Sequence, residues 1–340
     1  ELWMGAHPKA PSEVFINGTW ESLDQVIEKE AESVLGREVA EKFSRKLPFL
    51  FKVLAAEKPL SIQAHPDICK SKKGFERENR LNIPFDAPTR NYKDDNHKPE
   101  VLCALTRFQC LNGFRKVEEM LALLEKLSCP GISEEIGHLR KKPDPSGLKR
   151  FFSDMMTMDM ERQKSVVAEA IRISEQYAGK NQVFEWMAAL NREFPGDIGT
   201  LAPAFLSMLT LEPGEAIFLS PGMPHAYLHG VGIELMANSD NVLRGGLTQK
   251  HLDIPELLRV IDFSVEPIDK IKPEAEGATE VVYRTPAEEF LLSRIALHKK
   301  MVFTSSQRRS AEILICIEGE GVIEDVGNGE RLTLNRGQSV

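Results

Sequence analysis

The sequence predicts a mainly β protein that carries an inserted α-helical domain. β-type apolar runs dominate residues 47–111, a helical periodicity governs residues 117–194, and short β-type runs return from residue 209 onward. Strands and helices do not alternate as they would in a parallel sheet. The order β, α, β therefore favours a helical domain inserted into a β-barrel or sandwich.

The first β region holds three apolar runs, LPFLFKVLAA, LSIQAHP and PEVLCALTRFQCL. Each is short and rich in residues that favour strands. A polar stretch from Lys70 to Pro99 separates the last two runs and contains Gly, Asn and Pro. We interpret it as one long segment that lies outside the sheet.

The middle region changes to a helical period. Apolar residues recur at i, i+3, i+4, i+7 and i+10 between Val117 and Leu127, which predicts a helix. The same pattern predicts two further helices, over residues 166–177 and 183–194, and Pro195-Gly196 ends the last of them.

The final region returns to short strands separated by Pro-Gly and Gly-Asn turns. This region contains two weakly similar halves, LEPGEAIFLSPGMPHAYL and IEGEGVIEDV…LTLNRGQSV. Each combines a Gly-containing hairpin with a short strand, which suggests two barrels. The expected strands are LTLEPGEAIFL, PHAYLHGVGIELM, EFLLSRIAL, AEILICIEG, GVIEDV and RLTL.

Composition narrows the class of protein. A length of 340 residues favours two or three packed units, and 42% hydrophobic residues suffice for a core. The formal net charge of -8 has the wrong sign for a protein that binds nucleic-acid backbone, and no apolar run reaches the ~20 residues of a membrane span. Five cysteines without a CxxC pair predict reduced, buried thiols and a cytoplasmic location. The ends, Glu1 and Val340, suggest a truncated chain.

Three short motifs place metal-ligand side chains at the ends of predicted strands. In SIQAHP, a strand would project Gln63 and His65 from one face. NHKPE brings Glu100 to the start of a buried strand, and PHAY places His225 between a tight turn and an apolar strand. For any single histidine, a hydrogen-bonded structural role is the alternative, and the QAHP strand could simply turn its polar face to water. Together the four side chains suit Zn²⁺ with one open position, although manganese or iron would fit the same pattern.

Several cations lie near these motifs. Lys52 interrupts an apolar strand, Lys98 is in NHKPE, and Arg244 and Lys250 flank a Gly-Gly pair. In an acidic protein, such cations are best explained by an anionic substrate. The alternatives are a snorkelling Lys52 on an edge strand and a solvated Lys250 in a loop.

At these motifs the chain resembles the type I phosphomannose isomerases, and the bacterial members most closely. The shared motifs follow the family order from residue 1 to residue 257, interrupted by the helical block. They are ELWMGAHP, LPFLFKVL…PLSIQAHP, GFERENRLNIPFDA, RNYKDDNHKPE, PGEAIFL…PHAYLHG and ELMANSDNVLRGGLTQKHLDIPEL.

The resemblance implies two cupin-type jelly-roll barrels, a helical domain inserted in the first, and one zinc ion per chain. The expected domains are a metal-binding barrel of residues 1–112 and 200–258, a helical domain of residues 113–199, and a truncated second barrel of residues 259–340. The zinc ligands that it implies are Gln63, His65, Glu100 and His225.

The implied reaction interconverts mannose 6-phosphate and fructose 6-phosphate through a cis-enediolate, in a monomer whose partner is a small sugar phosphate. Arg244 matches the family's active-site arginine, within RGG instead of the commoner RAG, and Gln249 replaces the usual Pro before Lys250. The remaining role hypotheses are proton transfer by His97 and Lys98, ring opening or hydroxyl contacts by Asp240 and Glu234, and phosphate binding by Lys52, Ser61 and Lys250.

Three other classes stay open. An iron cupin oxygenase would need a site of two histidines and one carboxylate but has no use for the surrounding cations. A non-catalytic sugar-phosphate sensor would keep the cations and could lose the metal ligands. A related isomerase could accept other phosphorylated sugars.

Overall fold

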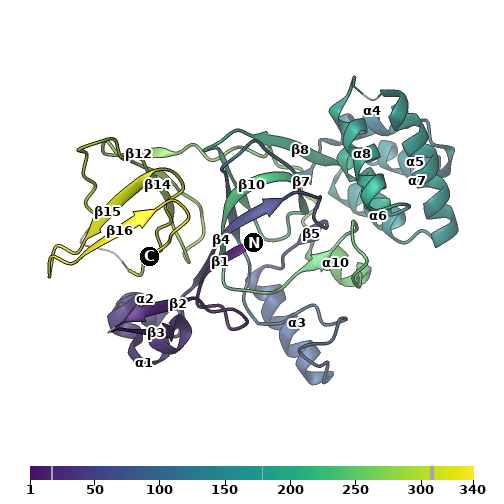
Figure 1. The fold of residues 1–340 in the computed structure, drawn as a ribbon. Helices are drawn as coiled ribbons and strands as arrows, with labels where there is room; N and C mark the ends of the chain where they lie inside the picture. Colours follow the sequence, from purple (N-terminus) through teal and green to yellow (C-terminus); the bar gives the residue numbers. More distant parts are fainter. Residues whose placement is uncertain (17, 178, 307–309) are drawn as a thin grey trace.

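An antiparallel sheet forms the centre of the molecule (Figure 1). The computed structural model describes residues 1–16, 18–177, 179–306 and 310–340. Within them this sheet has nine strands: β1 Leu2–Gly5, β4 Phe49–Ala56, β5 Gln63–Ala64, β6 Glu100–Ala104, β7 Phe108–Phe114, β8 Leu206–Leu211, β9 Ala216–Leu219, β10 His225–Ala237 and β11 Leu243–Arg244.

β10 is the longest strand of the sheet and changes partners along its length. Its first part pairs with β5 and β7, and its second part pairs with β4 and β6. Gly230 lies at this change with a φ of 127°, and a Cβ there would come within 2.8 Å of the Arg107 carbonyl oxygen. Only glycine accommodates both the backbone angle and the close approach.

The helical block lies at one end of the sheet (Figure 1). The helix predicted from Val117 to Leu127 is confirmed with those bounds. The other two predicted helices also form, although the first ends as a helix at Ser174 and continues only as a short 3₁₀ turn. The helices of the block are α4 Val117–Leu127, α5 Ser133–Lys141, α6 Pro145–Met156, α7 Met160–Ser174, α8 Gln182–Glu193 and α9 Ala202–Phe205.

Aromatic packing joins the helical block to the sheet. Phe114 at the end of β7 lies 5.7 Å from Phe152 of α6 and 5.3 Å from Phe263, measured between ring centroids. One continuous apolar cluster includes these rings together with Leu111 and Ala226 of the sheet. The block therefore shares its core with β7 and with β10, the strand that carries His225.

Four elements near the N-terminus lie away from the helical block (Figure 1) and were not predicted from periodicity. The hairpin of β2 Glu13–Ile16 and β3 Thr19–Ser22 precedes α1 Leu23–Leu35 and α2 Arg37–Lys42. The side chains of Ile27, Ala31 and Leu35 pack into a small apolar cluster of their own.

The polar stretch after QAHP is not a continuous excursion, because its first part forms helix α3, Ile68–Arg80. α3 has too few apolar residues to show a helical period, and its stability depends on specific contacts instead. Asp67 caps it by accepting a hydrogen bond from the Lys70 N–H at 2.8 Å. Gly74 faces the ring of the fully buried Tyr92, whose hydroxyl donates to Glu256 of α10 (Ile254–Val260) at 2.7 Å.

The C-terminal region forms separate small sheets. β12 Glu274–Glu276, β13 Glu280–Tyr283 and β14 Leu292–Ile295 make one, and β15 Glu320–Glu324 and β16 Arg331–Asn335 make another. The strand expected for AEILICIEG is wrong, since this run makes only an isolated bridge between Ile315 and Ser339. Within this run, Leu314 and Cys316 form backbone hydrogen bonds with residues 337–340, and these bonds do not continue into a regular strand pairing.

The predicted class, mainly β with a helical insert, is confirmed. No helix in the described ranges is long and apolar enough to cross a membrane. Cys103, Cys110 and Cys129 are buried, whereas Cys69 is exposed and Cys316 half-buried, so the prediction that the cysteines are buried is wrong for the last two.

The fit of Gly74 against Tyr92 can be tested by substitution. In Gly74→Ala the added methyl group would lie 2.4 Å from atoms of the Tyr92 ring, so we expect the substitution to lower the free energy of unfolding by about 1–3 kcal/mol in urea denaturation. Gly137→Ala is the control, because that helical glycine in α5 faces open space. The control should be neutral or stabilising by up to about 1 kcal/mol. Equal effects of the two substitutions would contradict this packing.

Candidate metal centre and active site

Three buried side chains converge near the first residue of β10. His65 follows β5, Glu100 begins β6, and His225 begins β10. Their ligand-type atoms lie within 4.8 Å of one another. Glu100 Oε2 is 3.5 Å from His65 Nε2 and 3.6 Å from His225 Nε2. These separations leave room for one cation between the three groups.

Backbone carbonyls fix the orientation of both imidazoles. His65 Nδ1 lies 2.7 Å from the Asn241 carbonyl oxygen, and His225 Nδ1 lies 3.0 Å from that of Met223. With the proton on Nδ1, each ring presents the lone pair of Nε2 to Glu100, which is the usual arrangement of metal-binding histidines. His65 Nε2 is buried without a hydrogen-bond partner among the described residues, so this donor set fits a metal ion.

The electrostatics also favour a metal site. Burial alone would raise the pKa of Glu100, but Lys98 and the two imidazoles lower it well below its usual value. Lys98 Nζ lies 2.9 Å from Glu100 Oε1. Burial and the neighbouring His65 lower the pKa of His225 to about 4. At neutral pH the site therefore offers a carboxylate and a neutral imidazole, the states that bind cations.

Gln63 lies beside this group. It pairs in register with His225 on β10 and with Arg244 on β11. Its side-chain amide contacts only the Ser61 hydroxyl, at 3.4 Å, among the contacts described. The amide oxygen is thus available to a cation, although QAHP forms a strand of just two residues, and His65 lies beyond its end.

A pocket opens onto the metal-ligand group. Side chains from β4, β5, β6 and β10 line it together with the segments that precede them. The lining residues are Glu1, Lys52, Leu54, Leu60, Ser61, Gln63, Lys98, Glu100, His225, Ala226, Tyr227 and Glu234.

A buried ion pair forms one wall of this pocket. Lys52 of β4 and Glu234 of β10 are direct neighbours in the sheet register, and Lys52 Nζ lies 2.8 Å from Glu234 Oε2. Burial alone would lower the pKa of Lys52, but the Glu234 carboxylate raises it overall. The Lys52 ammonium also lies 5.1 Å from the centre of the Trp3 ring. Lys52 is therefore a buried cation at the pocket and does not snorkel into solvent.

Besides the metal-ligand candidate His65, four of the predicted residues do not line this pocket. Arg244 is half-buried beside Gln63 in the β11 register, and burial lowers its pKa. His97 turns Nε2 toward Glu289 at 2.5 Å. Lys250 is exposed, with its backbone N–H bonded to the Thr248 hydroxyl.

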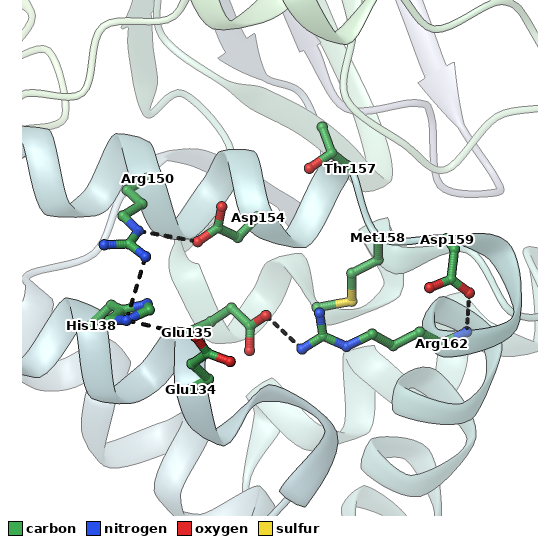
Figure 2. Close-up of a pocket in the computed structure, with 9 residues that line it drawn as sticks. All are labelled: Glu134, Glu135, His138, Arg150, Asp154, Thr157, Met158, Asp159 and Arg162. Carbon is green, nitrogen blue, oxygen red and sulfur yellow. Dashed lines mark hydrogen bonds and ion pairs between the residues drawn. The ribbon is translucent and has the colours of Figure 1, made fainter.

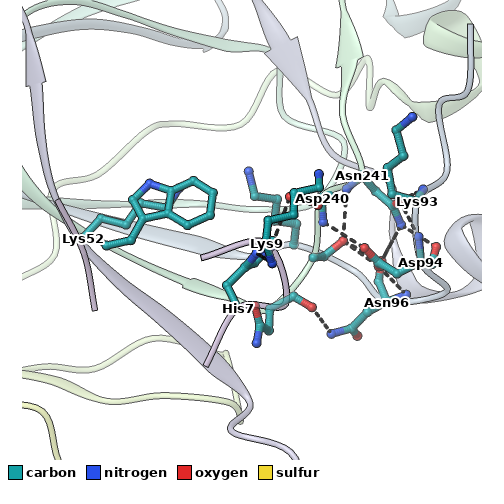
Figure 3. Close-up of polar contacts among 12 residues, drawn as sticks. His7, Lys9, Lys52, Lys93, Asp94, Asn96, Asp240 and Asn241 are labelled. Carbon is teal, nitrogen blue, oxygen red and sulfur yellow. Dashed lines mark hydrogen bonds and ion pairs between the residues drawn. The ribbon is translucent and has the colours of Figure 1, made fainter. Parts of the chain in front are cut away.

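The fourth of these residues, Asp240, lies in a separate polar network (Figure 3). Asp240 Oδ1 is 3.2 Å from His7 Nε2, and its Oδ2 is 2.6 Å from Lys9 Nζ. The contact with His7 is the main cause that holds the pKa of Asp240 well below its usual value. Sequence reasoning assigned no role to His7, because its partner is 233 residues away and no local motif connects them.

Tyr227 is a second residue that sequence reasoning missed. Its hydroxyl is buried at the pocket without a hydrogen-bond partner among the described residues, and burial raises its pKa well above the usual value. A signal was present in PHAY, since Tyr227 is two residues after His225 and lies on the same face of the strand.

A second cavity lies within the helical block, between α5, α6 and α7 (Figure 2). Its charged side chains pair with one another. Arg162 Nη2 is 2.6 Å from Glu135 Oε1, and Arg150 Nε is 3.5 Å from Asp154 Oδ2. Because both arginines already have carboxylate partners, we assign this cavity no catalytic role.

Comparison with known proteins identifies the family. A family model described as the catalytic domain of type I phosphomannose isomerase matches residues 1–117. The model of the helical insertion domain of the same family matches residues 132–206. The chain belongs to the type I phosphomannose isomerase family. Mannose-6-phosphate isomerase of Escherichia coli (strain K12) is 41% identical over 342 residues, which cover 100% of this chain and 85% of that protein.

More distant relatives and solved structures agree. The human mannose-6-phosphate isomerase is 36% identical, and the match covers 99% of this chain and 82% of that protein. A crystal structure of a point mutant of phosphomannose isomerase from Salmonella typhimurium superposes with a TM-score of 0.91 at 40% identity, over 99% of this chain and 84% of that one. A zinc-bound mannose 6-phosphate isomerase gives a TM-score of 0.89 at 39% identity, with the same coverage.

The ion pair of Lys52 and Glu234 should be important for stability. Glu234→Gln would leave the Lys52 ammonium buried without a counter-charge, so we expect it to lower the free energy of unfolding by about 3 kcal/mol. Glu193→Gln is the matched control, because it removes the same charge from an exposed pair with Lys58. That change should cost less than about 1 kcal/mol. Denaturant unfolding measures both, and equal losses would contradict the argument.

Proposed function

We propose that this protein is a zinc-dependent isomerase that interconverts mannose 6-phosphate and fructose 6-phosphate. The observation that carries the proposal is the buried group of His65, Glu100 and His225, which adjoins a pocket lined by Lys52 and Lys98. Membership of the phosphomannose isomerase family supports the reaction, and the zinc-bound relative supports the metal.

The metal ligands of the proposal are Gln63, His65, Glu100 and His225. Two imidazoles, one carboxylate and one amide oxygen suit zinc better than they suit a hard oxygen-seeking cation. When bound, zinc supplies a positive charge that stabilises negative charge developing on the substrate oxygens. The neutral amide of Gln63 keeps more of that charge available than a second carboxylate would.

Lys98 is our candidate for proton transfer between C1 and C2 through a cis-enediolate. Its side chain is 12% exposed, lines the pocket and contacts Glu100 Oε1. His97, the other candidate, directs Nε2 to Glu289 and lies outside the pocket lining. The lysine is therefore the better placed of the two to reach a substrate carbon.

The other roles follow the charges. We propose that Lys52 and Ser61, which both line the pocket, bind the substrate phosphate or hydroxyls, and that Glu234 holds the Lys52 ammonium in place. Arg244 and Lys250 would contribute from the segment after β10, and Asp240 would act in ring opening. Arg244, Lys250 and Asp240 do not line the pocket, so they would contact only the part of a bound substrate that extends beyond it.

The domain boundaries are part of the proposal. Residues 1–112 and 200–258 would form the metal-binding barrel, residues 113–199 the helical domain and residues 259–340 the second barrel. β7 pairs with β8, and β6 pairs with β9, although the helical block separates the members of each pair in the sequence. This pairing supports an insertion of residues 113–199 into the metal-binding barrel.

Removal of the metal tests the function directly. We expect a coupled assay that follows fructose 6-phosphate formed from mannose 6-phosphate to lose its signal after chelation and to regain it with zinc. Activity that does not respond to metal would overturn the zinc proposal. Zinc binding without any isomerisation would favour a sugar-phosphate sensor, and consumption of oxygen would favour an iron oxygenase.

Substitution of Lys98 tests its role in proton transfer. Lys98→Met should lower turnover by about 10²–10⁴-fold, the usual contribution of a general acid or base, while zinc still binds. Lys58→Met is the control, since it removes an exposed lysine that does not line the pocket. Both variants are compared by turnover and by zinc content, and near-normal turnover of Lys98→Met would exclude Lys98 from the mechanism.

A further inference from the structure

Asn241 is buried to 0% exposure in the segment between β10 and β11, and its main chain and side chain make different contacts. Its backbone carbonyl oxygen lies 2.7 Å from His65 Nδ1. Its side chain contacts residues 93–96, in the loop that leads to Glu100 (Figure 3). No motif of the sequence analysis assigned this residue a role.

Every polar atom of the Asn241 side chain is used. Its Oδ1 accepts hydrogen bonds from the backbone N–H groups of Lys93, at 2.7 Å, and Asp94, at 3.2 Å. Its Nδ2 donates to the carbonyl oxygens of Asp94, at 2.8 Å, and Asn96, at 2.9 Å. An asparagine that satisfies its full capacity against one short loop fixes the position of that loop.

Two neighbours reinforce the contact between the segments. The Ser239 hydroxyl donates to Asp94 Oδ1 at 2.8 Å, and Asp94 Oδ2 accepts the backbone N–H of Asp240 at 2.8 Å. The Asn241 backbone N–H donates to the Ser239 hydroxyl at 3.2 Å. The loop of residues 93–96 and the segment of residues 239–241 thus form one hydrogen-bonded unit, which we name the asparagine clamp.

We propose that Asn241 is the positioning residue of the metal centre. Through its carbonyl oxygen it holds the His65 ring with Nε2 toward Glu100, and through its side chain it anchors the loop that delivers Glu100. One residue would therefore set the separation between two of the metal ligands. The inference rests on the proposed zinc site but not on the isomerase reaction.

The chemistry of the clamp predicts a specific effect on zinc affinity. Loss of a hydrogen-bond partner behind a metal-binding histidine typically lowers metal affinity by about 10–100-fold. Asn241→Asp keeps the shape of the side chain but replaces the Nδ2 donor by an oxygen that faces the Asp94 and Asn96 carbonyl oxygens. The loop should then shift, and the two ligands should lose their fixed separation.

The experiment measures the zinc dissociation constant of the full chain by competition with a chelator. We expect Asn241→Asp to bind zinc about 10–100-fold more weakly than the wild type. In the metal-free protein, ¹⁵N spectra of the histidines should show His65 losing its single Nδ1–H tautomer. A role in general stability would instead lower the free energy of unfolding and leave both of these signals unchanged.

Asn238→Asp is the matched control. It makes the same chemical change in the same segment, but among the described residues the Asn238 side chain donates to the Leu47 carbonyl oxygen, at 3.3 Å, and not to the loop. The loop reaches Asn238 only at its backbone carbonyl oxygen, through Asn96 Nδ2, which the substitution leaves unchanged. Its zinc affinity should equal that of the wild type. A loss in Asn238→Asp as large as that in Asn241→Asp would overturn the proposal.

Ser239→Ala keeps the proposal testable if Asn241→Asp does not fold, since it loosens the clamp without adding a charge. A loss of zinc affinity of threefold or more in either variant supports the role of Asn241. A smaller loss in every variant that folds overturns it. A wild-type protein that does not bind zinc would refute the proposed metal site itself, an outcome distinct from failure of the clamp alone.

Discussion

The antiparallel pairing of β10 with β4, β5, β6 and β7 is the constraint on which the site depends. β10 carries His225, Tyr227 and Glu234, and its partners bring Lys52, Gln63 and Glu100 beside it. Since neighbouring strands lie about 5 Å apart, this register places Lys52 beside Glu234 and Gln63 beside His225. A shift of one residue would turn each side chain to the other face and dismantle the site.

Burial of charge is the second feature that connects the parts of the site. Glu100 is buried with Lys98 and two imidazoles, and Lys52 is buried with Glu234. Charges removed from water destabilise the fold unless they are paired, so each group depends on partners from other strands. The same desolvation strengthens electrostatic interactions with a ligand in the pocket. Burial of these charges therefore lowers the stability of the fold but strengthens the interaction of the site with a charged ligand.

Sequence reasoning succeeded where a local pattern of residues is enough to determine the structure. The period from Val117 to Leu127 is sufficient to define α4, and QAHP, HKPE and PHAY contain side chains that converge in the fold. It failed for α3, whose stability depends on Asp67 and on Tyr92 packing and not on an apolar stripe. It also failed for the AEILICIEG run, because an apolar run becomes a strand only if a neighbour is available to pair with it.

The sequence by itself determined the β, α, β order, the acidic and globular character, and the identity of the residues that could bind a metal. Spacing and residue type decide these properties, because they act over a few neighbouring positions. The tertiary structure alone decided that Lys52 meets Glu234, that His7 meets Asp240, and that Asn241 connects His65 to the loop before Glu100. These partners are 145 or more residues apart, so only the tertiary fold, with the pairing of β10 at its centre, brings them together.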